Sequence, residues 1–202
     1  MDRSLYKTIN RFADRTGWAH GLMRFYAKDG VVLFAVLLLI GWWLGRTSST
    51  PIAKVSAAVW TGAGALLALA INQPIGATID RARPYNAIAN MHLLVDKTTD
   101  FSFASDHATI AGAVAAGLWL VNRHLGIMAT IAAVAMAFAR VYVGAHYPGD
   151  VLGGLVLGAV VVVGLYKLAM IGLGPIATAL ARSPLRTLIT SEPRTATVID
   201  PA

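Results

Sequence analysis

Long stretches without a formal charge constrain this chain more than any other feature of its sequence. The longest runs from residue 55 to residue 79, a length of 25 residues that is sufficient to span a bilayer as a helix. Shorter uncharged runs occupy residues 30–45, 108–122, 125–139, 151–166 and 168–181. A soluble protein of 202 residues could not cover so many apolar segments, so the sequence predicts an all-α, polytopic membrane helix bundle.

The predicted bundle has about five transmembrane helices. They are expected at residues 30–45, 55–76, 106–122, 125–143 and 150–171. Residues 77–104 form a long polar connection, and connections of this length inside compact domains are usually functional. Small residues are dense in the later spans, which favours close contact between membrane helices.

The two ends of the chain differ from its apolar middle. Residues 4–28 combine regularly spaced apolar and basic positions, which predicts one amphipathic helix lying on the membrane surface. We therefore expect an N-terminal interfacial segment at residues 1–29 and a transmembrane domain at residues 30–181. Residues 182–202 contain three prolines among several Ser and Thr residues, which predicts a mobile tail.

The charge balance indicates contact with lipid headgroups. The net charge is +7, but the basic residues are scattered along the chain, so membrane lipids are the expected partners and nucleic acid is not. The chain has no cysteine, which excludes disulfides and thiolate chemistry. Nothing in the sequence indicates an oligomeric state.

Three clusters of basic, imidazole and acidic residues interrupt the apolar sequence. They are Arg81-Ala82-Arg83-Pro84, then Ser105-Asp106-His107, then Arg140 followed by His146 and Asp150. Charged residues beside membrane-length apolar runs are costly and usually functional. With five spans, all three clusters fall on the same face of the membrane, which predicts one composite site.

The arginines of the first and third clusters, together with the second cluster, are suited to bind an anion. Arg83 and Arg140 can each offer the planar, two-pronged donor that matches phosphate oxygens, and Arg81 is either a third clamp or a partner of Asp80. Ser105 and Asp106 stand where the third span begins. There, a capping side chain and free backbone N–H groups can meet an anion.

The third cluster suits nucleophilic catalysis. His146 and Asp150 are four residues apart, so a carboxylate can bind one imidazole nitrogen and leave the other free to attack. The same pair could instead belong to a metal site. However, few other ligands are near and the arginines would repel a cation, so we expect neither a metal nor another cofactor.

These clusters resemble the signature of the type 2 phosphatidic acid phosphatase superfamily, which includes membrane lipid phosphatases and vanadium haloperoxidases. The signature reads Lys-(six)-Arg-Pro, Pro-Ser-Gly-His and Ser-Arg-(five)-His-(three)-Asp, and the likeness covers residues 70–155. This chain departs from it at Gly76, where the signature has lysine, and at Ala104, Asp106 and Ala139. The run Ser-Asp-His-Ala-Thr resembles the bacterial undecaprenyl-diphosphatase branch, as do Ile9-Asn10 and residues 24–30.

The resemblance implies a helix bundle of the phosphatidic acid phosphatase and haloperoxidase type, and a role for each motif residue. It implies that His146 is the nucleophile, oriented by Asp150, and that His107 is the general acid. Arg83, Arg140 and Ser105 are then expected to hold the phosphoryl oxygens. Arg81 or Lys97 would supply the charge missing at Gly76, and Asp106 would tune the choice between diphosphate and monophosphate.

The expected activity is hydrolysis of undecaprenyl diphosphate to the monophosphate and inorganic phosphate, which recycles the cell-wall lipid carrier. The site is expected on the extracytoplasmic face of the plasma membrane, because cationic residues mark the opposite face: Arg46, Lys54, Arg123 and Lys167. Three alternatives stay open. They are a phosphatase for phosphatidylglycerol phosphate, phosphatidic acid or another lipid phosphate, a vanadate-dependent haloperoxidase, and a non-catalytic lipid-phosphate-binding protein.

Overall fold

Helices make up all of the regular secondary structure in residues 2–191, the part of the chain that this computed structural model describes. The α-helices in chain order are α1 (Asp2–Arg15), α2 (His20–Asp29), α3 (Val31–Arg46), α4 (Pro51–Ile79), α5 (Pro84–Ala87), α6 (Asp106–Val121), α7 (Arg123–Tyr142), α8 (Pro148–Gly164) and α9 (Tyr166–Ala181). Two short 3-10 helices are η1 (Gly17–Ala19) and η2 (Pro184–Leu188). The predicted all-α class is confirmed.

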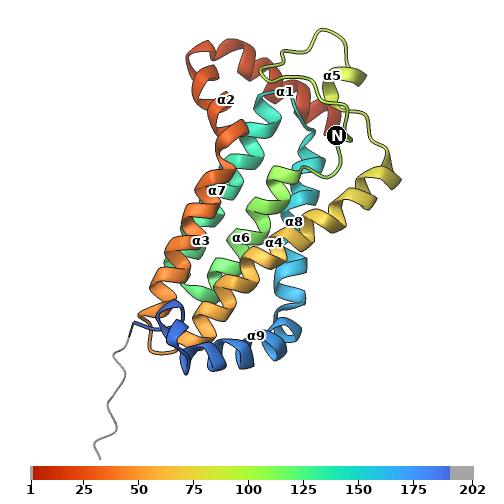
Figure 1. Cartoon of the computed structure of the whole chain (residues 1–202). Coiled ribbons are helices and arrows are strands. Elements are labelled where there is room, and N and C mark those ends of the chain that lie inside the picture. Colours follow the sequence, from red (N-terminus) through yellow and green to blue (C-terminus); the bar gives the residue numbers. More distant parts are fainter. Residues whose placement is uncertain (1, 192–202) are drawn as a thin grey trace, which may run out of the picture.

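Five helices, α3, α4, α6, α7 and α8, run side by side as a bundle (Figure 1). The central helix is α6, which packs against each of the other four. Its contact with α8 depends on glycine: a Cβ at Gly112 would collide with the backbone of Leu155, and one at Gly158 would collide with the backbone of Thr109. The dense small residues therefore bring the two helix backbones together.

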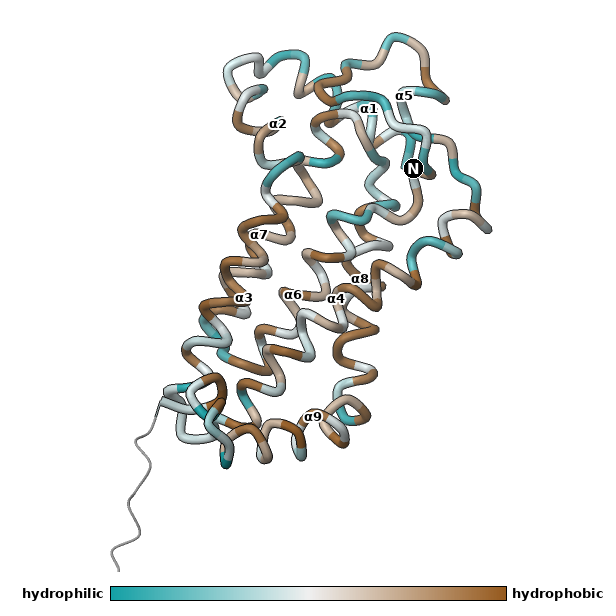
Figure 2. Tube along the Cα trace, in the orientation of Figure 1, coloured by the Kyte–Doolittle hydropathy of each residue, from teal (hydrophilic) through white to brown (hydrophobic). Residues whose placement is uncertain are grey.

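The helices of the bundle have the lengths, and its surface has the exposed apolar residues, that are typical of a membrane protein. The stretch Pro51–Ala87 and helix α7 are each long and apolar enough to cross a membrane, and two bent helix pairs raise the number to four if each pair is one span. Helix α6 is apolar but shorter, with 16 residues. The helices of the bundle consist mostly of hydrophobic residues (Figure 2). Many of these residues are exposed on its outside, and Leu66 and Ile131 are each more than 60% exposed. The chain is thus a multi-pass membrane protein.

The predicted fifth span, residues 150–171, is wrong at its C-terminal end. Helix α8 ends at Gly164, and α9 leaves it at 52° and runs across the end of the bundle (Figure 1). Glycine is a weak helix former, and Tyr166 and Lys167 follow it, which are residue types that favour the membrane–water interface.

The predicted single helix at residues 4–28 is also wrong, because it is broken into α1 and α2. The break lies at Thr16 and Gly17. The hydroxyl of Thr16 bonds to the carbonyl of Phe12, 2.8 Å away, and lies 2.7 Å from the hydroxyl of Tyr142 on α7. Gly17 has a low helix propensity, so the helix ends here, and the contacts of Thr16 hold the chain at the break. After the break, α2 turns back towards the bundle.

The predicted C-terminal tail lies only partly within the described residues. Residues 182–191 pack against the bundle: Ile189 is buried, and the indole of Trp42 donates a 3.0 Å hydrogen bond to the carbonyl of Leu188. Residues 192–202 lie outside the part of the chain that the structure describes.

Candidate active site

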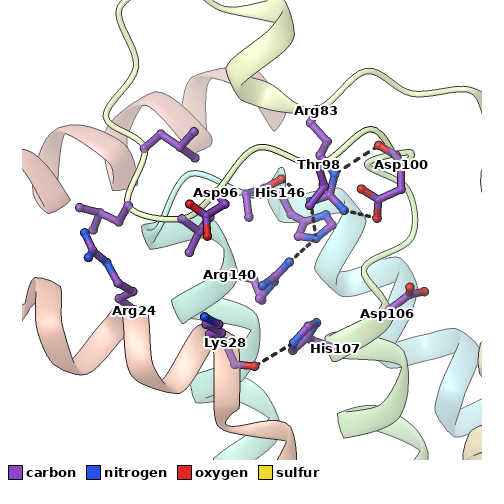
Figure 3. A pocket seen from close by; sticks show the side chains of 14 residues that line it. Arg24, Lys28, Arg83, Asp96, Thr98, Asp100, Asp106, His107, Arg140 and His146 are labelled. Carbon is purple, nitrogen blue, oxygen red and sulfur yellow. Dashed lines mark hydrogen bonds and ion pairs between the residues drawn. The ribbon is translucent and has the colours of Figure 1, made fainter.

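The segments that carry the three clusters meet at one end of the bundle, beneath α1, α2 and the 80–105 connection (Figure 1). Five of the predicted residues line one open cavity of about 630 Å³ there (Figure 3): Arg83, Asp106, His107, Arg140 and His146. The prediction of a single composite site on one face is consistent with this placement.

His146 lies on the turn between α7 and α8 and is 1% exposed. Its Nδ1 lies 2.8 Å from the carbonyl oxygen of Ser102, so Nδ1 carries the proton and Nε2 carries the lone pair. The turn needs Gly144, which has φ +84°, and a Cβ there would lie 2.7 Å from the carbonyl of His92.

Two arginines converge on the lone pair of this imidazole. Arg83 Nη1 and Arg140 Nη2 donate to His146 Nε2 over 3.2 and 3.1 Å. Burial lowers the pKa of His146 well below 6.5, and the charges of Arg140 and Arg83 lower it further. His146 is therefore a neutral imidazole at physiological pH, the form that a nucleophile requires.

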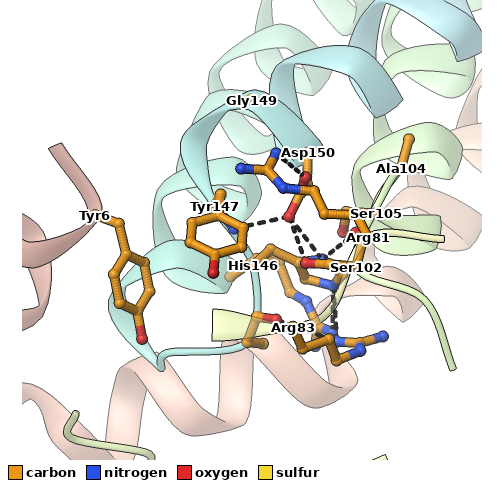
Figure 4. Close-up of polar contacts among 12 residues, drawn as sticks. Tyr6, Arg81, Arg83, Ser102, Ala104, Ser105, His146, Tyr147, Gly149 and Asp150 are labelled. Atoms are coloured by element: carbon orange, nitrogen blue, oxygen red, sulfur yellow. Dashed lines mark hydrogen bonds and ion pairs between the residues drawn. The ribbon is translucent and has the colours of Figure 1, made fainter. Parts of the chain in front are cut away.

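The predicted hydrogen bond between His146 and Asp150 is absent. The distance from His146 Nδ1 to Asp150 Oδ2 is 3.8 Å, which is too long. Instead, the hydroxyl of Ser102 donates to Asp150 while its carbonyl accepts from His146 (Figure 4). The backbone N–H of Tyr147 also donates to Asp150 over 2.9 Å. Asp150 thus holds the loop that orients His146 and does not touch the ring.

Arg81, predicted as either a third clamp or a partner of Asp80, does not line the cavity with Arg83 and Arg140. Its guanidinium forms ion pairs with Asp150, at 2.6 Å, and with Asp2 at the start of α1. It also lies 4.0 Å from the ring centroid of Tyr147. The carboxylates of Asp2 and Asp150 thus occupy guanidinium N–H donors of Arg81.

Arg83 and Arg140 are held in place by groups around the cavity. Arg83 pairs with Asp100 at 2.7 Å and donates to the carbonyl of Ala145 at 3.2 Å. Burial raises the pKa of Asp100, but a hydrogen bond from Thr98 and the charge of Arg83 outweigh this effect, and the net pKa lies below its ordinary value. Arg140 donates to the carbonyl of Ala27 at 3.0 Å.

Two of the predicted site residues each have a polar side-chain atom without a protein partner among the described residues. These atoms are the Nε of Arg140 and the hydroxyl of Ser105, and both are buried. Ser105 is the residue before α6, and its side chain does not cap the helix. Arg140 lines the cavity and Ser105 does not, so of these two atoms only the Nε of Arg140 belongs to a side chain at the cavity wall.

Asp106 and His107 form the first turn of α6. Asp106 Oδ1 accepts hydrogen bonds from two residues of α4, Asn72 at 2.7 Å and Gln73 at 3.4 Å. The Nε2 of His107 lies 3.3 Å from the carbonyl oxygen of Lys28. Both side chains line the cavity, and His107 lies on the side of Arg140 that faces away from His146 (Figure 3).

The position of the signature lysine has no room for a side chain. A Cβ at Gly76 would lie 2.8 Å from the carbonyl oxygen of Phe103. Lys97, the other candidate for the missing charge, lies 6.0 Å from the ring of Tyr85 and does not line the cavity. The additional cations of the cavity are Arg24 and Lys28 of α2.

Sequence reasoning missed Ser102, Asn72, Arg24 and Lys28. Ser102 and Asn72 belong to no motif, and only the tertiary structure brings them to Asp150 and to Asp106. Arg24 and Lys28 were assigned to a membrane-surface helix, although their spacing of four residues already placed them on one helix face. Within residues 2–191, no group of three or more His, Asp or Glu side chains is arranged to hold a metal ion.

Comparison with known proteins gives consistent matches. The sequence pattern of the PAP2 superfamily matches residues 57–170, more than half of the chain. The chain is 30% identical over 161 residues to undecaprenyl-diphosphatase BcrC of Bacillus subtilis, covering 80% of each protein. It is 32% identical over 161 residues to an undecaprenyl-diphosphatase of Sulfolobus acidocaldarius, covering 77% of this chain and 72% of that protein.

A solved structure shares the fold. The crystal structure of a transmembrane PAP2-type phosphatidylglycerolphosphate phosphatase from Bacillus subtilis superimposes with a TM-score of 0.56 at 22% identity. The match covers 82% of this chain and 85% of that one.

Proposed function

The chain belongs to the PAP2 superfamily and is a membrane lipid phosphatase, and from this premise we propose that its substrate is a polyprenyl diphosphate such as undecaprenyl diphosphate. The products would be the polyprenyl monophosphate and inorganic phosphate, which returns the lipid carrier of cell-wall synthesis to use. The names of the two relatives support this substrate. The observation that carries the chemistry is the lone pair of His146 Nε2 between two arginines at the floor of a cavity.

The first step is attack by His146 on the terminal phosphorus. A bond forms between Nε2 and phosphorus as the bond to the bridging oxygen breaks, and the leaving lipid phosphate takes a proton from His107. Arg83 and Arg140 exchange their present contacts with His146 Nε2 for contacts with the equatorial oxygens, and the unpaired hydroxyl of Ser105 donates to one of these oxygens, so that all three stabilise the developing charge. In the second step, His107 accepts a proton from water, the resulting hydroxide attacks phosphorus, and inorganic phosphate leaves His146.

His107 is placed to donate that proton. Its hydrogen bond to the carbonyl of Lys28 is 3.3 Å long, which is weak for an N–H···O bond. A substrate oxygen can replace this contact at little cost. His107 and His146 line the same cavity (Figure 3), so a diphosphate bound there lies between the proposed nucleophile and the proposed acid.

The proposed location is the plasma membrane, with the cavity on the extracytoplasmic side. Arg46, Lys54 and Arg123 lie at helix ends away from the cavity, and basic residues favour the cytoplasmic side. The basic segment 1–29 would then lie in the outer headgroups as the interfacial part, with residues 30–181 as the phosphatase domain. Exposed apolar side chains on α1, η1 and α2, such as Trp18 at 86% and Phe25 at 63%, support this placement.

The test is phosphate release by purified protein in detergent with a metal chelator. Undecaprenyl diphosphate is the expected substrate, and a panel of phosphatidylglycerol phosphate, phosphatidic acid and polyprenyl monophosphate tests the alternatives. We expect release from the diphosphate in chelator and none by His146→Ala. Preference for a lipid monophosphate would replace the proposed substrate, and equal activity of His146→Ala would refute the mechanism.

A further inference from the structure

We propose that Arg24 and Lys28 of α2 form a second phosphate subsite, which binds the phosphate that stays on the lipid. This inference rests on the proposed diphosphate substrate. It assigns the terminal phosphate to Arg83, Arg140 and His146, and the lipid-linked phosphate to α2.

The first observation is that both cations face the cavity without a partner. Arg24 and Lys28 line it, and neither side chain forms a hydrogen bond or an ion pair with any of residues 2–191. They are four residues apart on one helix, so they lie on the same face. Arg83, by contrast, is already paired with Asp100. In Figure 3, Lys28 lies below Arg140, and Arg24 lies to the left of both.

The second observation is that the C-terminal turn of α2 is fixed to the catalytic residues. The carbonyl of Ala27 accepts from Arg140 at 3.0 Å, and the carbonyl of Lys28 lies 3.3 Å from His107 Nε2. His107 is the proposed donor to the bridging oxygen. Lys28 also lines the cavity, so its side chain can reach a phosphate that lies beside His107.

The third observation concerns the size and charge of the cavity. Its volume of about 630 Å³ is within the ordinary range for a small-molecule site and leaves room beyond one phosphate group. Three carboxylates also line it, Asp96, Asp100 and Asp106. Their negative charges repel a substrate that carries two adjacent phosphates. Arg83 and Arg140 alone therefore do not balance the negative charge of the substrate and of these carboxylates. Arg24 offers a two-pronged donor and Lys28 a mobile point charge for the second group.

The main alternative is that Arg24 and Lys28 bind the phosphate groups of bulk membrane lipids and not the phosphate of the substrate. Exposed cations on a surface helix attract anionic lipids without any substrate specificity. The two sources differ in what they discriminate: a subsite for the retained phosphate separates diphosphate from monophosphate, whereas headgroup attraction affects both substrates alike and depends on the lipid composition.

The experiment compares Arg24→Gln and Lys28→Gln with Arg15→Gln, an exposed cation of α1 that does not line the cavity. Both Gln variants keep the backbone carbonyls that contact Arg140 and His107. Each enzyme is assayed in nonionic detergent, with and without phosphatidylglycerol, on the diphosphate and monophosphate of one polyprenol. Inhibition constants for inorganic diphosphate and inorganic phosphate are measured in parallel.

We expect kcat/KM for the diphosphate to fall about tenfold in each cavity variant, and the inhibition constant of inorganic diphosphate to rise by a similar factor. The values for the monophosphate and for inorganic phosphate should change less than about threefold, as should all values for Arg15→Gln. Parallel losses on both substrates, losses that appear only with phosphatidylglycerol, or no losses would overturn the subsite. Wild-type enzyme that fails to hydrolyse the diphosphate would instead overturn the proposed function.

Discussion

His146 and Asp150 are connected through Ser102 and not by a hydrogen bond of their own. The imidazole donates from Nδ1 to the carbonyl of Ser102, and the hydroxyl of Ser102 donates to Asp150, while 3.8 Å separates Nδ1 from the carboxylate. Ser102 thus links the buried carboxylate of Asp150 to the imidazole of His146, with its hydroxyl bound to the first and its carbonyl bound to the second (Figure 4).

Replacing Ser102 by alanine should therefore slow the reaction without weakening substrate binding. The variant keeps the carbonyl that accepts from His146 but releases the loop from Asp150, so the imidazole is less well oriented. We expect kcat to fall about tenfold with KM unchanged, and Ser102→Thr, which keeps a hydroxyl, to recover part of the loss. Steady-state kinetics on the diphosphate test this. An alanine variant with wild-type kcat would show that the connection has no catalytic effect.

Replacing Arg81 by glutamine should lower stability more than it impairs substrate binding. Its guanidinium is bound to Asp2 and to the fully buried Asp150, and removing it leaves that carboxylate without its ion-pair partner. We expect a loss of about 1–3 kcal/mol in the free energy of unfolding, with KM within about threefold of wild type. Thermal unfolding in detergent measures the first and kinetics the second. A large rise in KM with unchanged stability would restore Arg81 as a phosphate clamp.

The protonation of His146 should depend on its two arginines. Burial, Arg140 and Arg83 all lower its pKa below 6.5, so the neutral form persists as pH falls through 6.5 and is lost only at more acidic pH. Because the folded-state pKa is below that of the unfolded chain, protonating His146 at acidic pH destabilises the folded protein. Arg140→Gln removes one charge and should raise this pKa.

A titration of histidine ring resonances by NMR can check this expectation. The signals of His146 are assigned by their disappearance in His146→Asn. A midpoint for His146 at or above 6.5 in the wild type would contradict the electrostatic account.

Asp106 should influence the choice between diphosphate and monophosphate. Its carboxylate lines the cavity and is held by Asn72, so it adds a fixed negative charge near the substrate. We expect Asp106→Gly to change the ratio of kcat/KM values for the two substrates by about fivefold or more, and Asn72→Ala to shift it in the same direction. An unchanged ratio in Asp106→Gly would reject this role.

The sequence was sufficient to predict the bundle, and the gathering of several predicted site residues at one end of it, for physical reasons. Uncharged runs of membrane length have few other structures open to them, and the order of spans and clusters then determines which face each cluster occupies. Arg83, His107, Arg140 and His146 line one cavity as that argument requires.

The remaining parts of the site depend on tertiary contacts that carry no local pattern. The connection at residues 80–105 has no regular periodicity, so neither the bond from Ser102 to Asp150 nor the pairing of Arg81 with Asp2 could be predicted from spacing. The break at Gly17 turns α2 over the cavity, which places Lys28 in a site that a continuous surface helix would not reach.

The most direct test of the central claim is to trap the phosphorylated enzyme. Substrate labelled in its terminal phosphate is mixed with the protein, and the reaction is stopped within one turnover under alkaline conditions that preserve phosphohistidine. We predict label on His146 alone and no label in His146→Ala. In His107→Ala, label should both form and disappear more slowly, because His107 acts in both steps. Full turnover without label on His146, or with label on another residue, would contradict the mechanism.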